Sequence, residues 1–302
     1  MRYAVVSDIH ANWAALEAVY DDARKQSVGN FWCLGDIVGY GPDPVLCVRF
    51  LREQVQMDRW VLGNHDAGLI GLITTEDFNA EATEVLAKHH ALFQAPDNQE
   101  LWRWCQEHMT DARTQPHAMS YGDVVYVLVH ACLAPNQYVG RTTLSYLYPW
   151  ETTWIRRYGL DPLRDGHLQE GKRGCLLHGH THMPTFSDVV VAPGKRQSSR
   201  LRSIVYNQPL PLDGHLMVIN PGSVGQPRDG DRRAAYAIID TDASSVEFRR
   251  VTYDFRLTQA GMQRENYPIT LCERLSVAGS LADSDLLARV YRRTEDGLEA
   301  IA

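Results

Sequence analysis

The feature that most constrains the fold of this chain is a recurrence of short apolar runs that each lead directly into a polar, turn-prone segment. Between the first two runs, Leu16, Val19 and Ala23 lie on one face of a helical pattern over residues 14–26. Runs that alternate with helical patterns indicate an α/β domain. Because ligands bind where the carboxyl ends of strands meet their loops in open α/β sheets, the polar segments mark a candidate site. The predicted strands are residues 3–7, 31–34, 58–62, 124–130 and 175–178.

Beyond residue 182 the chain becomes richer in strand patterns, which favours a second, largely antiparallel sheet. The strands expected there are residues 187–191, 201–206, 216–219, 234–240 and 246–253. A stretch at 193–199, which overlaps a basic loop at 194–202, predicts an exposed connection. Its cations are either a solvated tip or a contact to a substrate phosphate.

Two helical segments complete the expected architecture. Residues 74–110 have a mostly helical pattern, with Asp77 as an N-cap, and predict a lid or side wall. Apolar residues of this segment, such as Leu92 and Trp102, belong either to the core or to a homodimer contact. A helical extension is expected from about residue 255. Since no repeat, low-complexity tract or linker divides the chain, we expect one domain over residues 1–302.

Composition excludes several classes of protein. The chain has 302 residues and 44% apolar content, enough for a sizeable core, and its six scattered cysteines form no disulfide framework or zinc ribbon. The apolar stretch at residues 3–6 is interrupted by Asp8 too soon for a signal peptide, and no window suits a membrane span, so we expect a cytoplasmic protein without membrane contact. A net charge of −7 makes nucleic acid an unlikely partner and favours a small phosphorylated substrate.

The first two polar segments place carboxylates and an imidazole directly after predicted strands. Asp8 and His10 follow the first strand, where a two-residue spacing in extended backbone would point both side chains toward a shared cation. Asp36 follows the second strand among three glycines that allow a sharp turn, and its two oxygens can bridge two ions. Each segment alone is also typical of a polar strand end with a helix cap.

The remaining segments add proton-transfer groups and further ligands. Asn64 offers an amide oxygen, His65 can hold or donate a proton near neutral pH, and Asp66 could orient that imidazole. His130 ends a long apolar run, where a single histidine is more often structural than a ligand. Residues 178–182 contain three histidines, a density that packing explains poorly because charged imidazoles repel one another unless a metal or acid intervenes. The mixed oxygen and imidazole donors suit manganese, iron or zinc better than calcium or copper.

Together, these segments resemble the calcineurin-like metallophosphoesterase superfamily, in particular its compact bacterial phosphodiesterase branch. The family pattern of D-x-H, G-D, G-N-H-D, H and G-H-x-H is matched without a gap from Asp8 to His182, and residues 220–228 resemble a turn of that branch. The resemblance implies an α/β (α+β) fold, a four-layer α/β/β/α sandwich of two mixed β-sheets flanked by helices.

The resemblance also implies a site with two divalent metal ions, with manganese first and iron, zinc or nickel as alternatives. One ion would be bound by Asp8, His10, Asp36 and His182. The other would be bound by Asp36, Asn64, His130 and His180, which makes Asp36 the bridge. His65 would lie beside the ions and stabilise the transition state or protonate the leaving oxygen, with Asp66 as its partner. The histidines expected to be structural are His89, His90, His108, His117, His167, His178 and His215.

The activity implied is hydrolysis of a phosphomonoester or phosphodiester bond in a small nucleotide-type substrate, by attack of a hydroxide that bridges the ions. Arg228 or the basic loop would hold a remote phosphate. The alternative from another class is a catalytically weak scaffold that binds a protein partner, although such branches typically lose the intact G-N-H-D segment around His65. A serine/threonine protein phosphatase is disfavoured because the segment after Asp36 lacks the expected arginine. A nuclease is disfavoured by the acidic balance.

Overall fold

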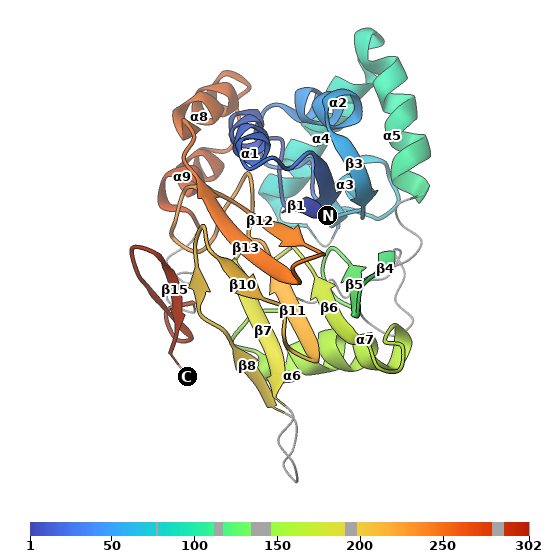
Figure 1. Cartoon of the computed structure of the whole chain (residues 1–302). Coiled ribbons are helices and arrows are strands. Elements are labelled where there is room, and N and C mark those ends of the chain that lie inside the picture. Colours follow the sequence, from blue (N-terminus) through green and yellow to red (C-terminus); the bar gives the residue numbers. More distant parts are fainter. Residues whose placement is uncertain (77, 112–116, 134–145, 191–197, 280–286, 302) are drawn as a thin grey trace.

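Two six-stranded mixed sheets lie face to face, with helices covering both outer faces (Figure 1). This computed structural model describes residues 1–76, 78–111, 117–133, 146–190, 198–279 and 287–301. The predicted four-layer α/β/β/α sandwich is therefore confirmed. No helix within these ranges is both long and apolar enough to cross a membrane.

The first sheet is parallel on one side of β1 and antiparallel on the other. β1 pairs in parallel with β2, which pairs in parallel with β3, and α1 (Trp13–Lys25) and α2 (Pro44–Gln54) make the two crossovers. On its other edge β1 pairs antiparallel with β12. The strands in spatial order are β10 (Pro209–Pro211), β13 (Ser245–Val251), β12 (Ala234–Asp240), β1 (Arg2–Val6), β2 (Asn30–Cys33) and β3 (Gln56–Trp60).

The second sheet has three parallel strands at its centre, because β6 pairs in parallel with both β5 and β11. Its outer face is covered by α6 (Thr152–Ile155), the π-helical turn η2 (Arg156–Leu160) and α7 (Asp161–Gly166). The edge strand β4 was not predicted from the sequence. The spatial order is β4 (His117–Tyr121), β5 (Val124–Leu128), β6 (Arg173–Leu177), β11 (Leu216–Asn220), β7 (Thr185–Val190) and β8 (Ser198–Leu201).

Alternation of apolar side chains along the strands produces three separate cores. In β1, Tyr3 and Val5 point into the core between the sheets, whereas Ala4 and Val6 point toward the helices of the first outer layer. A strand that is buried on both faces must be apolar at every position, which is why its run appeared continuous in the sequence. The same alternation in β5 fills the central core and the core beneath α6 and α7.

The prediction that the strands after residue 182 form a sheet of their own is wrong. β12 and β13 extend the first sheet, and β7, β8 and β11 complete the second. The physical reason is that the first strands of each sheet leave edges with unpaired backbone groups, and the later strands pair with those edges. Apolar periodicity shows which face of a strand is buried but not which strand lies at its edge.

The segment expected to be mostly helical, residues 74–110, holds two long helices and starts differently from the expectation. It contains α4 (Ala80–Gln94), a 3-10 turn η1 (Pro96–Asn98) and α5 (Gln99–Asp111), preceded by the short α3 (Asn64–Leu69). Asn79 caps α4 by accepting a hydrogen bond from the Ala82 amide, while Asp77 lies outside the described residues. Trp102 packs in the core between the first sheet and its outer helices, whereas Leu92 remains 40% exposed.

The C-terminal extension is helical only in its first part. α8 (Phe255–Arg264) and α9 (Ile269–Val277) pack against each other. The expectation of helix to the end of the chain is wrong, because β14 (Tyr291–Arg293) and β15 (Gly297–Ala300) join β9 (Ile204–Val205) in a three-stranded sheet. Of the basic loop at 194–202, residues 194–197 lie outside the described ranges and residues 198–201 form β8.

Candidate metal centre

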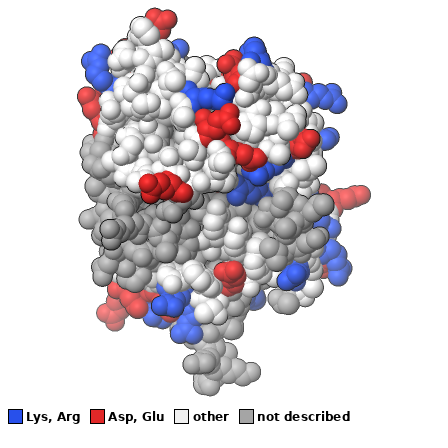
Figure 2. Space-filling model, turned by 180° about the vertical axis from the view of Figure 1, so that it is seen from behind, with Lys and Arg blue, Asp and Glu red and all other residues white. Residues whose placement is uncertain are grey.

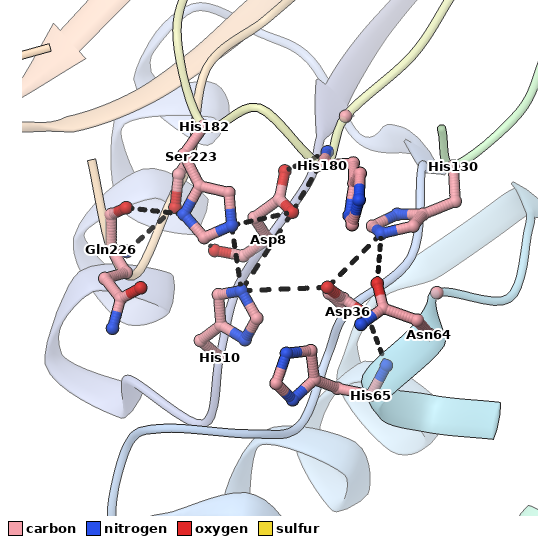
Figure 3. A network of polar contacts seen from close by, with 12 residues as sticks. Asp8, His10, Asp36, Asn64, His65, His130, His180, His182, Ser223 and Gln226 are labelled. Atoms are coloured by element: carbon pink, nitrogen blue, oxygen red, sulfur yellow. Dashed lines mark hydrogen bonds and ion pairs between the residues drawn. The ribbon is translucent and has the colours of Figure 1, made fainter. Parts of the chain in front are cut away.

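All seven residues predicted as ligands converge on one buried cluster at the carboxyl ends of strands from both sheets (Figure 3). The first sheet supplies side chains after β1 and β2 and at the start of α3, while the second sheet supplies those after β5 and β6. These residues are Asp8, His10, Asp36, Asn64, His130, His180 and His182, and none is more than 9% exposed.

The backbone of the cluster is twisted into a conformation that the sequence did not predict. Asp8 and His10 have φ values of 52° and 49°, so the expectation that extended backbone points them to one side is wrong. Asp36, His180 and His182 also lie in the left-handed region, with φ values of 55°, 65° and 59°. Such φ angles are uncommon outside glycine and tend to gather at functional sites, where the surrounding structure enforces them.

Two glycines let the loops approach one another. A Cβ on Gly63 would lie 2.1 Å from Asp36 Oδ1, and one on Gly179 would lie 1.9 Å from Ser7 Oγ and 2.8 Å from Asp8 Oδ2. Any side chain at either position would displace a carboxylate of the cluster or the hydroxyl beside it.

Backbone carbonyls orient three of the imidazoles. The Nδ1 atoms of His10, His130 and His182 lie 2.9, 2.7 and 2.7 Å from the carbonyl oxygens of Val38, Leu34 and Gln226. Since a carbonyl oxygen can only accept, each Nδ1 must carry the hydrogen. In a neutral ring the Nε2 atom then presents a lone pair, and all three Nε2 atoms point into the cluster.

At the centre of the cluster, the Nε2 lone pairs of neutral imidazoles therefore face one another and the oxygens of carboxylate and amide groups, all of which are hydrogen-bond acceptors. His10 Nε2 lies 3.2 Å from His182 Nε2, and His182 Nε2 lies 3.3 Å from Asp8 Oδ1. His130 Nε2 lies 3.2 Å from Asp36 Oδ2 and 3.1 Å from the amide oxygen of Asn64. Converging lone pairs repel unless a proton or a cation lies between them.

The direction of the pKa shifts shows the same shortage of positive charge. Burial raises the pKa of Asp8 to about 7. Burial lowers the pKa of His130, but the charge and hydrogen bond of Asp36, together with the charge of Asp8 and the Leu34 carbonyl, outweigh burial and raise the pKa to about 9. His180 Nε2 is buried with no hydrogen-bond partner among the described residues. This donor set, buried and short of cations, fits divalent metal ions.

A turn after β11 supports this arrangement from outside the cluster. Ser223 donates its hydroxyl proton to the Asp8 carbonyl at 2.8 Å, and its oxygen accepts from the Gln226 amide at 2.8 Å. The Asn220 amide donates to the Gly179 carbonyl at 2.8 Å. Residues 220–228 thus fix the loops after β1 and β6, which explains their place in the sequence pattern.

His65 lies beside the cluster, and its ring is packed between Tyr40 and Phe78 with centroid distances of 4.6 and 5.1 Å. Burial lowers the pKa of His65 to about 4, so its imidazole is neutral at neutral pH. Its Nδ1 is buried without a hydrogen-bond partner among the described residues. The sequence had not singled out Tyr40, although its place in the Gly39-Tyr40-Gly41 turn was a signal.

The expected partnership of Asp66 with His65 is not what the contacts show. One Asp66 oxygen accepts from the Ile37 and Val38 amides at 2.9 and 3.1 Å, and the other accepts from Gly63 at 3.1 Å. Consecutive residues of a helix point in different directions, so Asp66 and His65 in α3 cannot face each other. Asp66 instead anchors the Asp36 loop to the start of α3.

Among the histidines expected to be structural, His89 has a clear structural part. Its Nε2 donates to the Gly41 carbonyl at 2.9 Å, and its Nδ1 accepts from the Gly39 amide at 3.3 Å. His178 is also buried and lies 3.1 Å from the Gly179 carbonyl through Nδ1. His89 therefore holds the turn that carries Tyr40.

Residues 1–244 of the chain match the family model of the calcineurin-like phosphoesterase superfamily domain. This region includes the whole cluster. The chain belongs to this superfamily. A crystallised metallophosphoesterase from Sphaerobacter thermophilus is 31% identical, with a TM-score of 0.65 and coverage of 92% of this chain and 99% of that chain. The predicted resemblance is confirmed, and membership of this metallophosphoesterase family makes the calcineurin-like chain a hydrolase.

Two further relatives of this calcineurin-like chain differ in how much they share with it. An uncharacterized protein of Methanocaldococcus jannaschii is 27% identical over 280 residues, which are 90% of this chain and 96% of that protein. The symmetrical bis(5'-nucleosyl)-tetraphosphatase of Psychromonas ingrahamii is 30% identical over 137 residues, which are 45% of this chain and 46% of that protein. The chain thus spans less than half the length of the tetraphosphatase.

Proposed function

We propose that this protein hydrolyses phosphate esters of a small nucleotide-type substrate at a centre of two divalent ions, with manganese as the native metal. The observation that carries the proposal is the convergence of acceptor atoms, in which His10 Nε2 and His182 Nε2 face each other at 3.2 Å. The nucleotide part is suggested by the tetraphosphatase relative, whose own substrate is a dinucleoside polyphosphate by name.

The residues divide into two ligand groups that share Asp36. Asp8, His10 and His182 lie on one side of the cluster, and Asn64, His130 and His180 lie on the other. Two cations there would lower the pKa of a bound water, orient the phosphoryl group and neutralise its developing charge. The carbonyls that fix each Nδ1 keep the ligand rings in place and set their tautomer.

His65 is assigned to the leaving group. Its neutral ring can donate an N–H hydrogen bond to the oxygen that departs, and nearby cations would keep the ring neutral because they oppose a second proton. Tyr40 and Phe78 pack against the imidazole and restrict its orientation beside the cluster. Asp66 acts on the reaction through the position of the Asp36 loop rather than through His65.

The test is a metal-loading experiment with two readouts. Protein stripped by a chelator is reloaded with manganese, its metal content is measured, and hydrolysis of bis-p-nitrophenyl phosphate, mononucleotides and dinucleoside polyphosphates is assayed. We expect two manganese ions per chain and activity only in the loaded form. A chain that binds fewer than two ions, or hydrolyses the panel equally well after stripping, would contradict the proposal.

A further inference from the structure

Arg228 is the last residue of the 220–228 turn that supports the ligand loops. Its backbone amide donates to the His182 carbonyl at 3.3 Å, and its guanidinium donates to the Gln226 side chain at 3.1 Å. Arg228 is therefore attached by hydrogen bonds both to the loop that carries His182 and to Gln226, whose carbonyl fixes the His182 ring.

Within the described part of the chain, no carboxylate lies within ion-pair distance of Arg228. The contrast is Arg250, a fully buried arginine whose guanidinium pairs with Asp229, the residue next to Arg228. A half-buried guanidinium that has no ion-pair partner and lies beside a centre for two cations is electrostatically unfavourable. An anion that arrives with the substrate would supply the missing counter-charge.

Two tyrosines stand beside this guanidinium. The Arg228 guanidinium carbon lies 6.0 Å from the centroid of the Tyr40 ring. Tyr146 is stacked on the imidazole of His180 at 4.1 Å; burial raises the pKa of its hydroxyl, and the charge of the nearby Arg228 opposes that rise. Tyr146 is also 36% exposed. Arg228, Tyr40 and Tyr146 therefore form a wall of the site that runs from the predicted ligand His180 to solvent. A guanidinium with phenolic hydroxyls beside it is a set of donors suited to phosphate oxygens.

Residues beyond the family match hold this wall in place. Tyr40 packs in a cluster with Met262, Tyr267 and Leu271 of the C-terminal extension. The backbone of Gly279 lies so close that a Cβ there would be 2.9 Å from Arg228 Cα. Since the matched region ends at residue 244, the contacts that fix Tyr40 and Arg228 come in part from residues outside that match.

We propose that Arg228, Tyr40 and Tyr146 form an anion subsite that binds a second phosphate group, attached to the phosphate that is cleaved. The substrate class is then a nucleoside diphosphate or polyphosphate rather than a simple monoester, and this inference rests on the proposed function. A polynucleotide would also bring adjacent phosphates, but it needs a continuous basic track. On the face in Figure 2, the described Lys and Arg residues are interspersed with Asp and Glu.

The test compares the affinities of ADP and AMP, which differ by one phosphate, for manganese-loaded protein by titration calorimetry at matched free metal. We expect wild-type protein to bind ADP more tightly than AMP. Arg228→Gln should weaken ADP at least about tenfold and AMP by much less, because a charge-assisted contact to the second phosphate is lost. Arg228→Lys should keep part of the preference. The matched control is Arg232→Gln, an exposed arginine over the Phe255 ring, which should keep the wild-type ratio.

Two results would overturn the subsite. One is a wild-type protein without preference for ADP, a measurement that needs no variant to fold. The other is an equal loss of AMP and ADP affinity in Arg228→Gln, which would place Arg228 on the phosphate under attack. Failure of the proposed function looks different, since wild-type protein loaded with manganese would then hydrolyse no phosphoester of the panel, whatever its binding preference.

Discussion

The pH dependence of folding stability should reveal the buried imidazole of His89. The side chain is fully buried, and burial lowers its pKa to about 3, against an ordinary value of 6.5. In the unfolded chain His89 takes up a proton near pH 6.5, whereas in the folded protein it stays neutral until about pH 3. Stability must therefore fall as the pH drops below 6.5, because the unfolded state binds the extra proton.

The magnitude follows from the gap between the two pKa values. Each pH unit between them costs about 1.4 kcal/mol, so His89 should remove about 2.7 kcal/mol of unfolding free energy between pH 6.5 and pH 4.5. His89→Gln keeps a group that can donate to the Gly41 carbonyl and accept from the Gly39 amide. We expect this variant to be less stable than wild type by about 1–2 kcal/mol at pH 7.5. At pH 4.5 the variant should equal or exceed the stability of wild type.

Urea unfolding at fixed pH steps, with chelator present so that metal binding does not contribute, measures both curves. His90→Gln is the matched control, because it removes the next imidazole of α4, which is only partly buried and contacts Gln94. The reasoning about His89 is refuted if the difference between His89→Gln and wild type stays constant from pH 7.5 to pH 4.5. The reasoning is equally refuted if the difference in unfolding free energy between His90→Gln and wild type changes from pH 7.5 to pH 4.5 by as much as it does for His89→Gln.

Three further outcomes are expected at the metal centre. His65→Ala should slow turnover by about 10²–10⁴-fold while two ions remain bound, because the ring assists the leaving group without holding metal; loss of both ions would show that His65 is a ligand. Gly63→Ala should lower manganese occupancy, since its Cβ would lie 2.1 Å from Asp36 Oδ1, and metal analysis showing full occupancy would disprove the steric argument. Manganese should raise the unfolding free energy of wild type by about 2.7 kcal/mol at a hundred times its dissociation constant, and an equal rise in Asp36→Ala would exclude Asp36 as the bridge.

The sequence predicted the strands of the site because their apolar runs were long and their ends were marked by glycine and carboxylates. The edge strand β4 was not predicted from the sequence, because a half-exposed strand such as residues 117–121 has too few apolar positions to give a clear strand pattern. The pairing of β12 with β1 could not be predicted from the sequence either, because backbone hydrogen bonds between distant strands carry no side-chain signature.

The candidate site divides in the same way. Residue types and order alone were enough to mark Asp8, Asp36 and the histidines of residues 178–182 as candidates, because only a few side chains can bind a cation and the chain places them after strands. His130 was added by the family resemblance. Tertiary structure decided which atoms face inward, through left-handed backbone at Asp36 and carbonyls that fix each Nδ1. It also directed Asp66 to the Asp36 loop rather than to His65, and it stacked Tyr146 on the ring of His180. The types of side chain, which the sequence gives directly, determine which chemistry is possible. The orientation of their ligand atoms depends on contacts between residues far apart in the chain.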